Sequence, residues 1–193
     1  MKSILNKLLN GRLTRWGFLA VLLLAAGATV AGMKDRQYQL GGAFIGNGGA
    51  GIWNALQIPL DPAGRTAALR VSSGTLSPQF AGLFAALDAT GGGSDNVGEM
   101  EMISRDTARF GTVAYAREQV PGNPLQINSI FVMTGTVKFT GPDTIVVTYT
   151  INVYPAGADV NGDGYPDPGA QPIVIPGILP IQGVDTAKRV TVR

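Results

Sequence analysis

A chain of 193 residues with 45% hydrophobic and 15% charged side chains can bury an ordinary core, which excludes disorder of the whole chain. Its 27 glycines and 12 prolines favour many short elements joined by turns, as in an all-β protein. The formal charge of +2 does not indicate a nucleic-acid partner, because residues 1–32 hold four basic and no acidic residues, which leaves 11 basic against 13 acidic residues in the rest.

The first 33 residues have the pattern of an export signal. Residues 1–15 are cationic, residues 16–33 are uncharged, and small residues follow the most apolar stretch. This order predicts a signal peptide over residues 1–32, cleaved after Ala28 or Ala31, and a single β domain over residues 33–193. The alternative is an uncleaved membrane anchor at residues 16–33. Both interpretations predict an exported domain, periplasmic or extracellular. The absence of cysteine excludes disulfides and a lipoprotein anchor, and fits a bacterial protein.

Beyond this leader, polar and apolar residues alternate with period two, which predicts about eight strands in a mainly antiparallel meander. Such a meander closes into a barrel or folds into a sandwich. The expected strands are residues 38–46, 51–60, 65–73, 97–103, 109–118, 127–139, 144–154 and 186–193. Turn sequences at residues 61–64, 104–108 and 140–144 join three hairpins.

The glycine-rich stretch GNGGAG at residues 46–51 matches the dinucleotide-binding pattern G-x-G-x-x-G. That site requires a helix starting at Gly51 and a parallel βαβ unit. Pro59 and the turn at residues 61–64 cut the segment short. A hairpin turn is therefore favoured over a nucleotide site.

One helix interrupts the strand pattern. Ser77 can cap it, Pro78 suits its first position, and "TGGGSDN" ends it. One face carries an apolar stripe, formed by Phe80, Leu83, Phe84 and Leu87. The helix is expected either to plug a barrel end or pack on a sheet, or to form a lid over a ligand cavity.

Glu99 and Glu101 lie on one face of an expected strand, about 7 Å apart by strand rise. Two carboxylates at that separation could act on a glycoside. The favoured interpretation is a solvent-facing pair, with Met100 and Met102 facing the core.

The hairpin over residues 127–154 has the clearest alternation. Its second strand is expected to bury one face, formed by Ile145, Val147, Tyr149, Ile151 and Val153. The first strand is expected to bury Ile127, Phe131, Met133, Val137 and Phe139.

The stretch ADVNGDGYPDPG at residues 158–169 places oxygen-bearing side chains at alternate positions around two glycines. Calcium takes six to eight hard oxygen ligands, and glycine permits the tight turn that brings them together. The stretch resembles the calcium loops of EF-hands, dockerins and thrombospondin type 3 repeats over about nine residues. The resemblance implies side-chain ligands from Asp159, Asn161, Asp163 and Asp167 and a backbone oxygen from Tyr165.

The loop departs from these families at Ala170, where the EF-hand has a bidentate glutamate. Water or a distant acid must complete the shell, and the dissociation constant is expected near 10⁻⁴ to 10⁻³ M. The alternative is a solvated Asx-rich loop without metal. Given calcium, its role is expected to be structural, clamping the proline-rich crossing over residues 166–180, which has room for an edge strand at residues 172–175.

The favoured function is an exported, calcium-stabilised β domain with a structural or binding role at the cell envelope. The whole chain resembles exported bacterial β proteins, which assigns no activity. The alternatives are a lipocalin-like carrier of a small apolar ligand, by analogy of architecture, and a carboxylate-dependent hydrolase. The absence of histidine excludes Ser-His and Cys-His nucleophile systems. The expected partners are calcium and either a small apolar ligand or an envelope component. No nucleic-acid partner is expected, because the arginines at 65, 70, 105, 109 and 117 lack interleaved aromatics.

Overall fold

The computed structural model describes residues 38–191, except residues 50, 88, 90 and 119–125. The predicted signal peptide, residues 1–32, lies outside the described residues. Among the described residues, no helix has the length and apolar character needed to cross a membrane.

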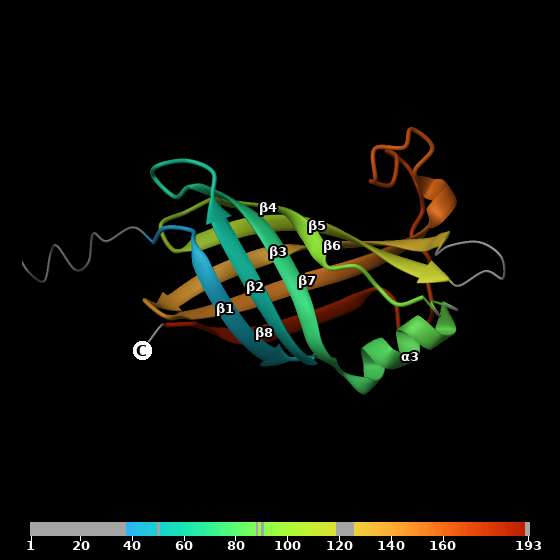
Figure 1. The fold of residues 1–193 in the computed structure, drawn as a ribbon, viewed down its shortest axis with the longest axis horizontal. Helices are drawn as coiled ribbons and strands as arrows, with labels where there is room; N and C mark the ends of the chain where they lie inside the picture. Colours follow the sequence, from blue (N-terminus) through green and yellow to red (C-terminus); the bar gives the residue numbers. More distant parts are fainter. Residues whose placement is uncertain (1–37, 50, 88, 90, 119–125, 192–193) are drawn as a thin grey trace, which may run out of the picture. The chain divides into compact units, whose positions relative to one another are not determined.

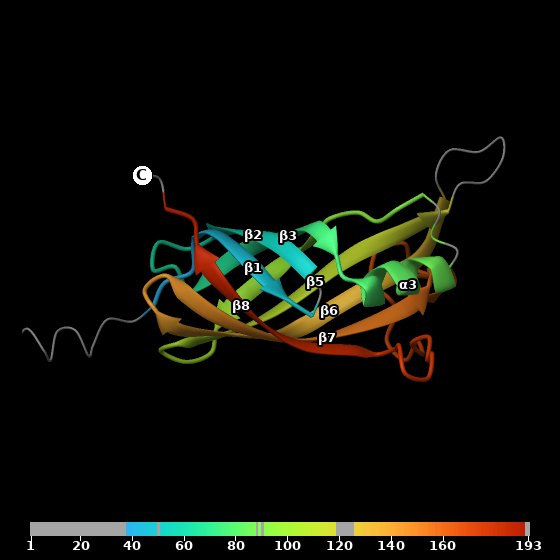
Figure 2. The same cartoon turned by 90° about the horizontal axis from the view of Figure 1, so that it is seen from below.

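Eight antiparallel strands, each paired with its neighbours in sequence, form a closed barrel (Figures 1 and 2). The predicted all-β meander is confirmed, and it closes as a barrel. The last strand pairs with the first, so every strand has a partner on both sides. The strands are β1 Gly42–Gly48, β2 Gly51–Pro59, β3 Thr66–Leu76, β4 Asn96–Met102, β5 Thr107–Glu118, β6 Gln126–Gly141, β7 Thr144–Pro155 and β8 Ile181–Arg189.

The three predicted hairpin turns join β2 to β3, β4 to β5 and β6 to β7. Asp61 explains the first of them, because its carboxylate accepts hydrogen bonds from the backbone amides of Ala63 and Arg65, both at 2.8 Å. An aspartate that bonds the backbone a few residues ahead is the local chemistry of an Asx turn.

The lumen of the barrel holds the core. All five residues predicted on the inner face of β7 are buried, while Thr148 between them is exposed. The inner faces of the other strands contribute mostly apolar residues, including Phe44, Trp53, Leu69, Met100, Phe110, Val137 and Ala187. The period-two pattern therefore located the inner wall.

Ile127 is the exception on β6. It was predicted to be buried, and 44% of it is exposed. A β-bulge between Ala116 and Arg117 on β5 leaves Asn128 without a partner in the ladder. Asn128 is thus one extra residue on β6, and it reverses the side to which the residues beyond it, including Ile127, point. The prediction was wrong because the alternation does not reveal the bulge.

The predicted helix is α3, Pro78–Ala86, and it lies at one end of the barrel (Figure 1). Its cap is Ser77, whose hydroxyl accepts a 3.4 Å hydrogen bond from the Phe80 amide. Leu83 is fully buried, and the ring of Phe84 stacks on Phe131 of β6 with centroids 5.6 Å apart. The apolar stripe therefore packs against the barrel end.

The crossing from β7 to β8 starts with the short 3₁₀ helix η1, Ala156–Ala158, and lies at the same barrel end as α3 (Figures 1 and 2). The edge strand predicted at residues 172–175 is wrong. Ile175 makes only an isolated bridge with Leu179, since Pro172 and Pro176 lack the N–H that a ladder needs. β8 also begins five residues earlier than predicted.

Candidate functional sites in the acidic loop and the lumen

The acidic loop winds around the carboxylate of Asp159. One oxygen accepts hydrogen bonds from the amides of Gly162 at 2.8 Å and Asp163 at 3.1 Å, and the other accepts from Gly164 at 2.9 Å. Gly162 and Gly164 have φ values of +76° and +88°, which favour glycine. The two glycines of the motif therefore allow the backbone to turn around one acid.

The other predicted ligands also contact the loop's own backbone or side chains. Asn161 Oδ1 accepts from the Asp163 amide at 2.9 Å, and Asp163 Oδ1 accepts from the Tyr165 amide at 2.8 Å. Asp167 Oδ2 accepts from the Val160 amide at 2.8 Å. The predicted ligand residues thus share one compact loop, and every acidic or amide side chain in the set has a hydrogen-bond partner within it.

These oxygens are hard donors of the kind that calcium prefers. In the part of the chain that the structure describes, however, no group of three or more acidic, histidine or cysteine side chains converges closely enough to hold a metal ion. The residues fit calcium in chemistry and in order along the loop, while their carboxylates are not gathered around one point. Calcium binding here stays a prediction.

The loop is attached to the barrel through Tyr115. The Tyr115 hydroxyl on β5 donates to the Gly164 carbonyl at 3.1 Å. A Cβ at Gly164 would come within 2.5 Å of that hydroxyl, so this position needs glycine for space as well as for φ. Burial, and secondarily the neighbouring Tyr115, raises the pKa of the Tyr165 phenol. The loop therefore rests on the outer wall of the barrel.

A second candidate site lies in the lumen. A cavity of about 80 Å³ is bounded by inward-facing residues of the strands and by Phe80 of α3. Its wall is mostly apolar, with side chains such as Leu69, Met100, Phe110, Val147 and Ile151. Polar groups come from Gln57, Ser73, Asn96, Tyr149 and Asp185. Few polar groups in an apolar wall are typical of ligand sites, which are usually larger, at roughly 300–1,000 Å³.

Asp185 on β8 is the acid in this cavity, and only 2% of it is exposed. Its Oδ2 accepts a 2.8 Å hydrogen bond from the Trp53 indole Nε1, and its Oδ1 accepts a 2.9 Å bond from the Gly49 amide. Both donors are neutral. The site therefore holds a buried carboxylate that is oriented by hydrogen bonds from β2 and from the β1–β2 turn.

The glycines of the GNGGAG motif leave room for the side chains of Asp185 and Trp53. The motif forms the β1–β2 hairpin turn, with Gly48 opposite Gly51, as the hairpin interpretation predicted. A Cβ at Gly48 would overlap the Asp185 carboxylate, and a Cβ at Gly46 would overlap the Trp53 ring. The glycines thus serve close side-chain packing in the lumen, not a phosphate.

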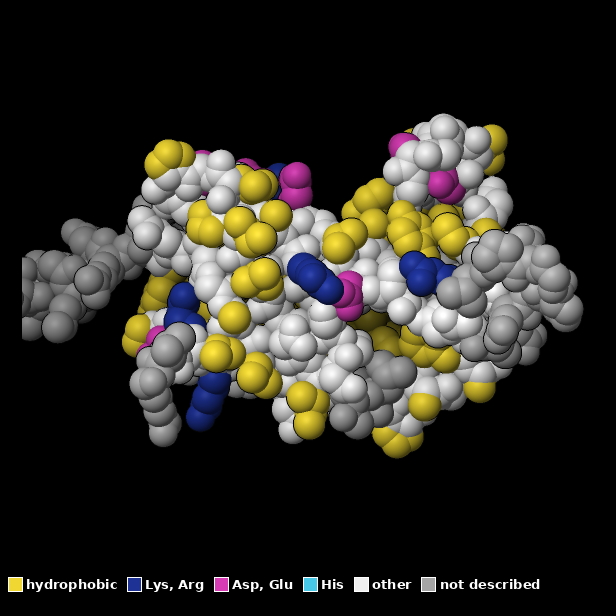
Figure 3. Space-filling view, in the orientation of Figure 1, with side chains coloured by type: hydrophobic (Ala, Val, Ile, Leu, Met, Phe, Trp, Pro, Cys, Tyr) yellow, Lys and Arg dark blue, Asp and Glu magenta, His cyan; other side chains and the backbone are white. Residues whose placement is uncertain are grey.

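The cavity opens where β3 and β4 separate. The two strands pair only as far as Val71 and Asn96, and β3 then continues with β2 alone. Phe80 of α3 and Asn96 belong to the cavity wall here. Figure 3 shows a hollow with hydrophobic side chains in its depth between β3 and the segment that follows α3. α3 thus borders this opening, which the plug interpretation alone did not anticipate.

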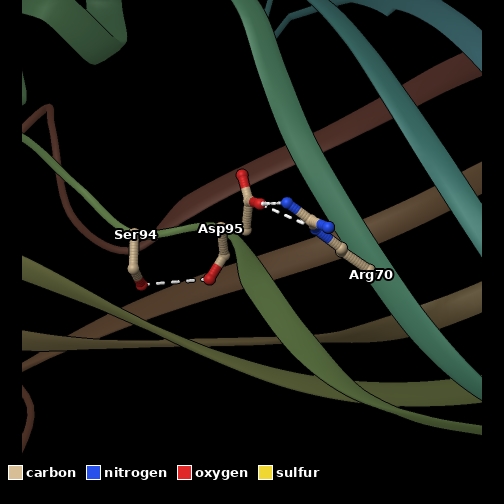
Figure 4. Close-up of polar contacts among 3 residues, drawn as sticks. All are labelled: Arg70, Ser94 and Asp95. Carbon is tan, nitrogen blue, oxygen red and sulfur yellow. Dashed lines mark hydrogen bonds and ion pairs between the residues drawn. The ribbon is translucent and has the colours of Figure 1, made fainter.

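An ion pair bridges the same seam on the outside (Figure 4). Arg70 of β3 donates from Nε to the Asp95 carboxylate at 2.7 Å and also forms a salt bridge with it through Nη2. Hydrogen bonds from Arg70, and then from Ser72, lower the pKa of Asp95. Ser94 donates its hydroxyl to the Asp95 carbonyl at 3.0 Å and accepts from the Tyr115 amide. These contacts fix the segment that precedes β4.

Glu99 and Glu101 lie outside the lumen cavity, and Met100 and Met102 are buried as predicted. Glu101 accepts a 2.8 Å hydrogen bond from Arg109. This ion pair on the outer wall matches the solvent-facing interpretation and offers no paired acid and base.

The lumen site was missed in the sequence because Asp185 preceded the expected last strand. A strand that begins at Ile181 puts Ile181, Gly183, Asp185 and Ala187 on one face, and that phase would have indicated an inward acid. For Trp53, the alternation along β2 predicted only that its side chain faces inward, and nothing in the sequence linked it to Asp185.

Comparison with known proteins finds no matching family model, no similar curated protein and no similar solved structure.

Proposed function

We propose that this protein is an exported β-barrel that binds a small ligand in its lumen and is clamped by calcium at the loop of residues 158–169. The leader pattern of residues 1–32 supports export, and the absence of cysteine is consistent with it. The binding role depends on one observation above the others, the lumen cavity with the buried acid Asp185 in its wall.

A lipocalin-like carrier of a small apolar ligand is the variant of this function that the architecture favours. An eight-stranded up-and-down barrel with one end bordered by a helix suits such a role. The cavity of about 80 Å³ limits the cargo, because an engineered cavity of about 150 Å³ binds benzene. The ligand is therefore expected to have only a few heavy atoms within the lumen.

Xenon tests the binding role. Xenon enters apolar cavities, so pressurising the full chain with the gas should shift the methyl NMR signals of Val147 and Ile151, which belong to the cavity wall. Ala55→Leu fills the cavity and should abolish the shifts. Unchanged methyl signals in the unsubstituted protein would contradict a lumen binding site and favour a purely structural barrel.

The calcium clamp is supported by the order of oxygens along the loop and by its turn around Asp159. A bound ion would offset the repulsion among the loop's acids and stabilise the folded state by mass action. With a dissociation constant near 10⁻⁴ M, 10 mM calcium should raise the free energy of unfolding by about 2.7 kcal/mol.

Thermal unfolding with and without calcium tests the clamp. Asp163→Asn should lose most of the calcium-dependent rise in Tm, whereas Asp143→Asn, in the turn between β6 and β7, should keep it. An equal Tm with calcium and with chelator would refute the clamp, and the loop would then be a solvated Asx-rich turn.

A further inference from the structure

We propose that the lumen cavity selects a short primary amine, whose ammonium group binds the Asp185 carboxylate while its alkyl chain occupies the apolar part of the cavity. The proposal rests on the lumen binding role and adds the chemical class of the ligand to it. The proposal depends on the charge of the Asp185 side chain, on its hydrogen-bond partners and on the residues around it.

The Asp185 carboxylate retains the capacity to accept further hydrogen bonds. A carboxylate offers about four lone-pair sites, and among the described residues each oxygen accepts one hydrogen bond, from Trp53 or Gly49. These two donors fix the orientation of the carboxylate and leave acceptor sites over. Because Asp185 belongs to the cavity wall, a ligand in the cavity can reach it.

In the described part of the chain, no positive side chain compensates this acid within the cavity. Among the described residues that form the wall, none is lysine or arginine, and the ionisable ones are Asp185 and Tyr149. The neighbouring Lys188 on β8 is exposed, and Arg189 bonds the Gly41 carbonyl and lies over the Phe44 ring. Removing a carboxylate from water is costly unless a positive partner accompanies it.

A primary ammonium group suits these conditions better than the other small ligands. It brings one positive charge and three N–H donors to the open acceptor sites. A neutral alcohol brings one donor and no charge, and an anion would be repelled. A metal ion needs several oxygen ligands, whereas this wall is mostly apolar and Gln57 Oε1 already accepts from the Gly41 amide.

The size and wall of the cavity set the length of the alkyl chain. About 80 Å³ is roughly half of an engineered cavity that binds the six heavy atoms of benzene, so about three heavy atoms fit inside and a longer alkyl chain would extend toward the opening. The apolar side chains of Phe110, Val147 and Ile151 form the wall available to the chain. The opening beside Phe80 and Asn96 provides an entry path.

The surrounding sequence accommodates the acid at specific points. Gly48 leaves room for the Asp185 side chain, and Gly46 leaves room for the Trp53 ring that donates to it. Three strands therefore build the surroundings of the acid. β1 contributes the two glycines, β2 contributes Trp53 and β8 contributes Asp185. An oriented, buried acid beside an apolar cavity wall is the arrangement that recognises a small cation with an apolar tail.

Titration of the ¹⁵N-labelled full chain with n-butylammonium tests the inference. The Trp53 indole N–H signal, assigned with Trp53→Phe, should shift and saturate. The matched probes n-butanol and butyrate have nearly the same shape, so we expect butanol to bind at least tenfold more weakly than butylammonium and butyrate not to bind. This comparison needs only the unsubstituted protein, so it does not depend on whether any variant folds.

Asp185→Asn keeps the shape of the side chain and removes its charge. In this variant butylammonium should lose its preference of tenfold or more over butanol. Equal binding of butylammonium and butanol to the unsubstituted protein would overturn the amine assignment but leave the lumen binding role, which xenon tests separately. If xenon binds and none of the three probes does, the amine inference fails alone. If xenon also fails to bind, the proposed lumen function fails with it.

Discussion

The buried carboxylate of Asp185 is held by hydrogen bonds from the Trp53 indole N–H and the Gly49 amide. The fit around it is close, since its side chain lies against Gly48. In such a setting the absence of one Cβ decides whether a side chain can take its place. Glycine at position 48 is thus part of the lumen site.

Gly48→Ala should destabilise the protein by about 1–3 kcal/mol, because the new Cβ would overlap the Asp185 side chain and displace it from its donors. Urea denaturation measures the change. Gly157→Ala is the matched control, since no atom lies within 4 Å of the added Cβ. Equal stability of the two variants would show that Asp185 moves aside without cost.

A second prediction at this scale concerns pH. Hydrogen bonds from the Thr66 hydroxyl, and then from the backbone amides of Arg65, Thr66 and Ala63, lower the pKa of Asp61 to about 2. The folded pKa lies below the usual 3.8, so this stabilisation is complete above pH 4 and is lost as the pH falls toward 2. The Tm of the unsubstituted protein should therefore fall more steeply over this range than that of Asp61→Asn. Parallel curves would contradict this account of the turn.

At the scale of elements, α3 depends on tertiary packing more than on its own propensity. Its nine residues are too few for an isolated helix to be stable in water. Leu83 and Phe84 pack against the barrel, and Ser77 supplies the cap. Because α3 also borders the cavity, its stability bears on access to the lumen.

Leu83→Ala should cost about 2–5 kcal/mol, since Leu83 is fully buried and its truncation leaves a cavity under the helix. Gly82→Ala, on the exposed side of the same helix, should instead stabilise by about 0.5–1 kcal/mol, because it meets no atom within 4 Å. Chemical denaturation measures both. Equal effects of the two substitutions would mean that α3 is not packed on the barrel.

At the scale of the whole molecule, closure joins the first strand to the last. β8 pairs with β7 on one side and with β1 on the other, across the full sequence length of the barrel. Every strand is therefore paired on both sides along at least part of its length. We expect the barrel to unfold as one cooperative unit.

Amide hydrogen exchange tests closure. The paired amides of β1 and β8 should be protected as strongly as those of the hairpin β6–β7, because each belongs to a continuous ladder. Exchange at β1 and β8 that is many times faster than at β6 and β7 would show that the barrel opens at this seam.

The sequence by itself determined the strands, three hairpin turns and the helix with its cap, because these depend on local chemistry. Period-two alternation, the Asp61 turn and Ser77 before Pro78 are all readable within a few residues. It also predicted the composition of the acidic loop, whose calcium binding stays a prediction.

Only the tertiary structure decided that the meander closes as a barrel, that Ile127 faces outward beyond a bulge, and that Asp185 meets Trp53. Trp53 and Asp185 are 132 positions apart in the sequence. Closure of the barrel depends on the pairing of β1 with β8. Pairing between strands that are distant in sequence depends on the packing of all the strands together. A short stretch of sequence therefore does not predict it. The lumen site therefore exists only in the closed barrel. The sequence shows Gly46, Gly48 and Asp185, but it does not show that they lie together.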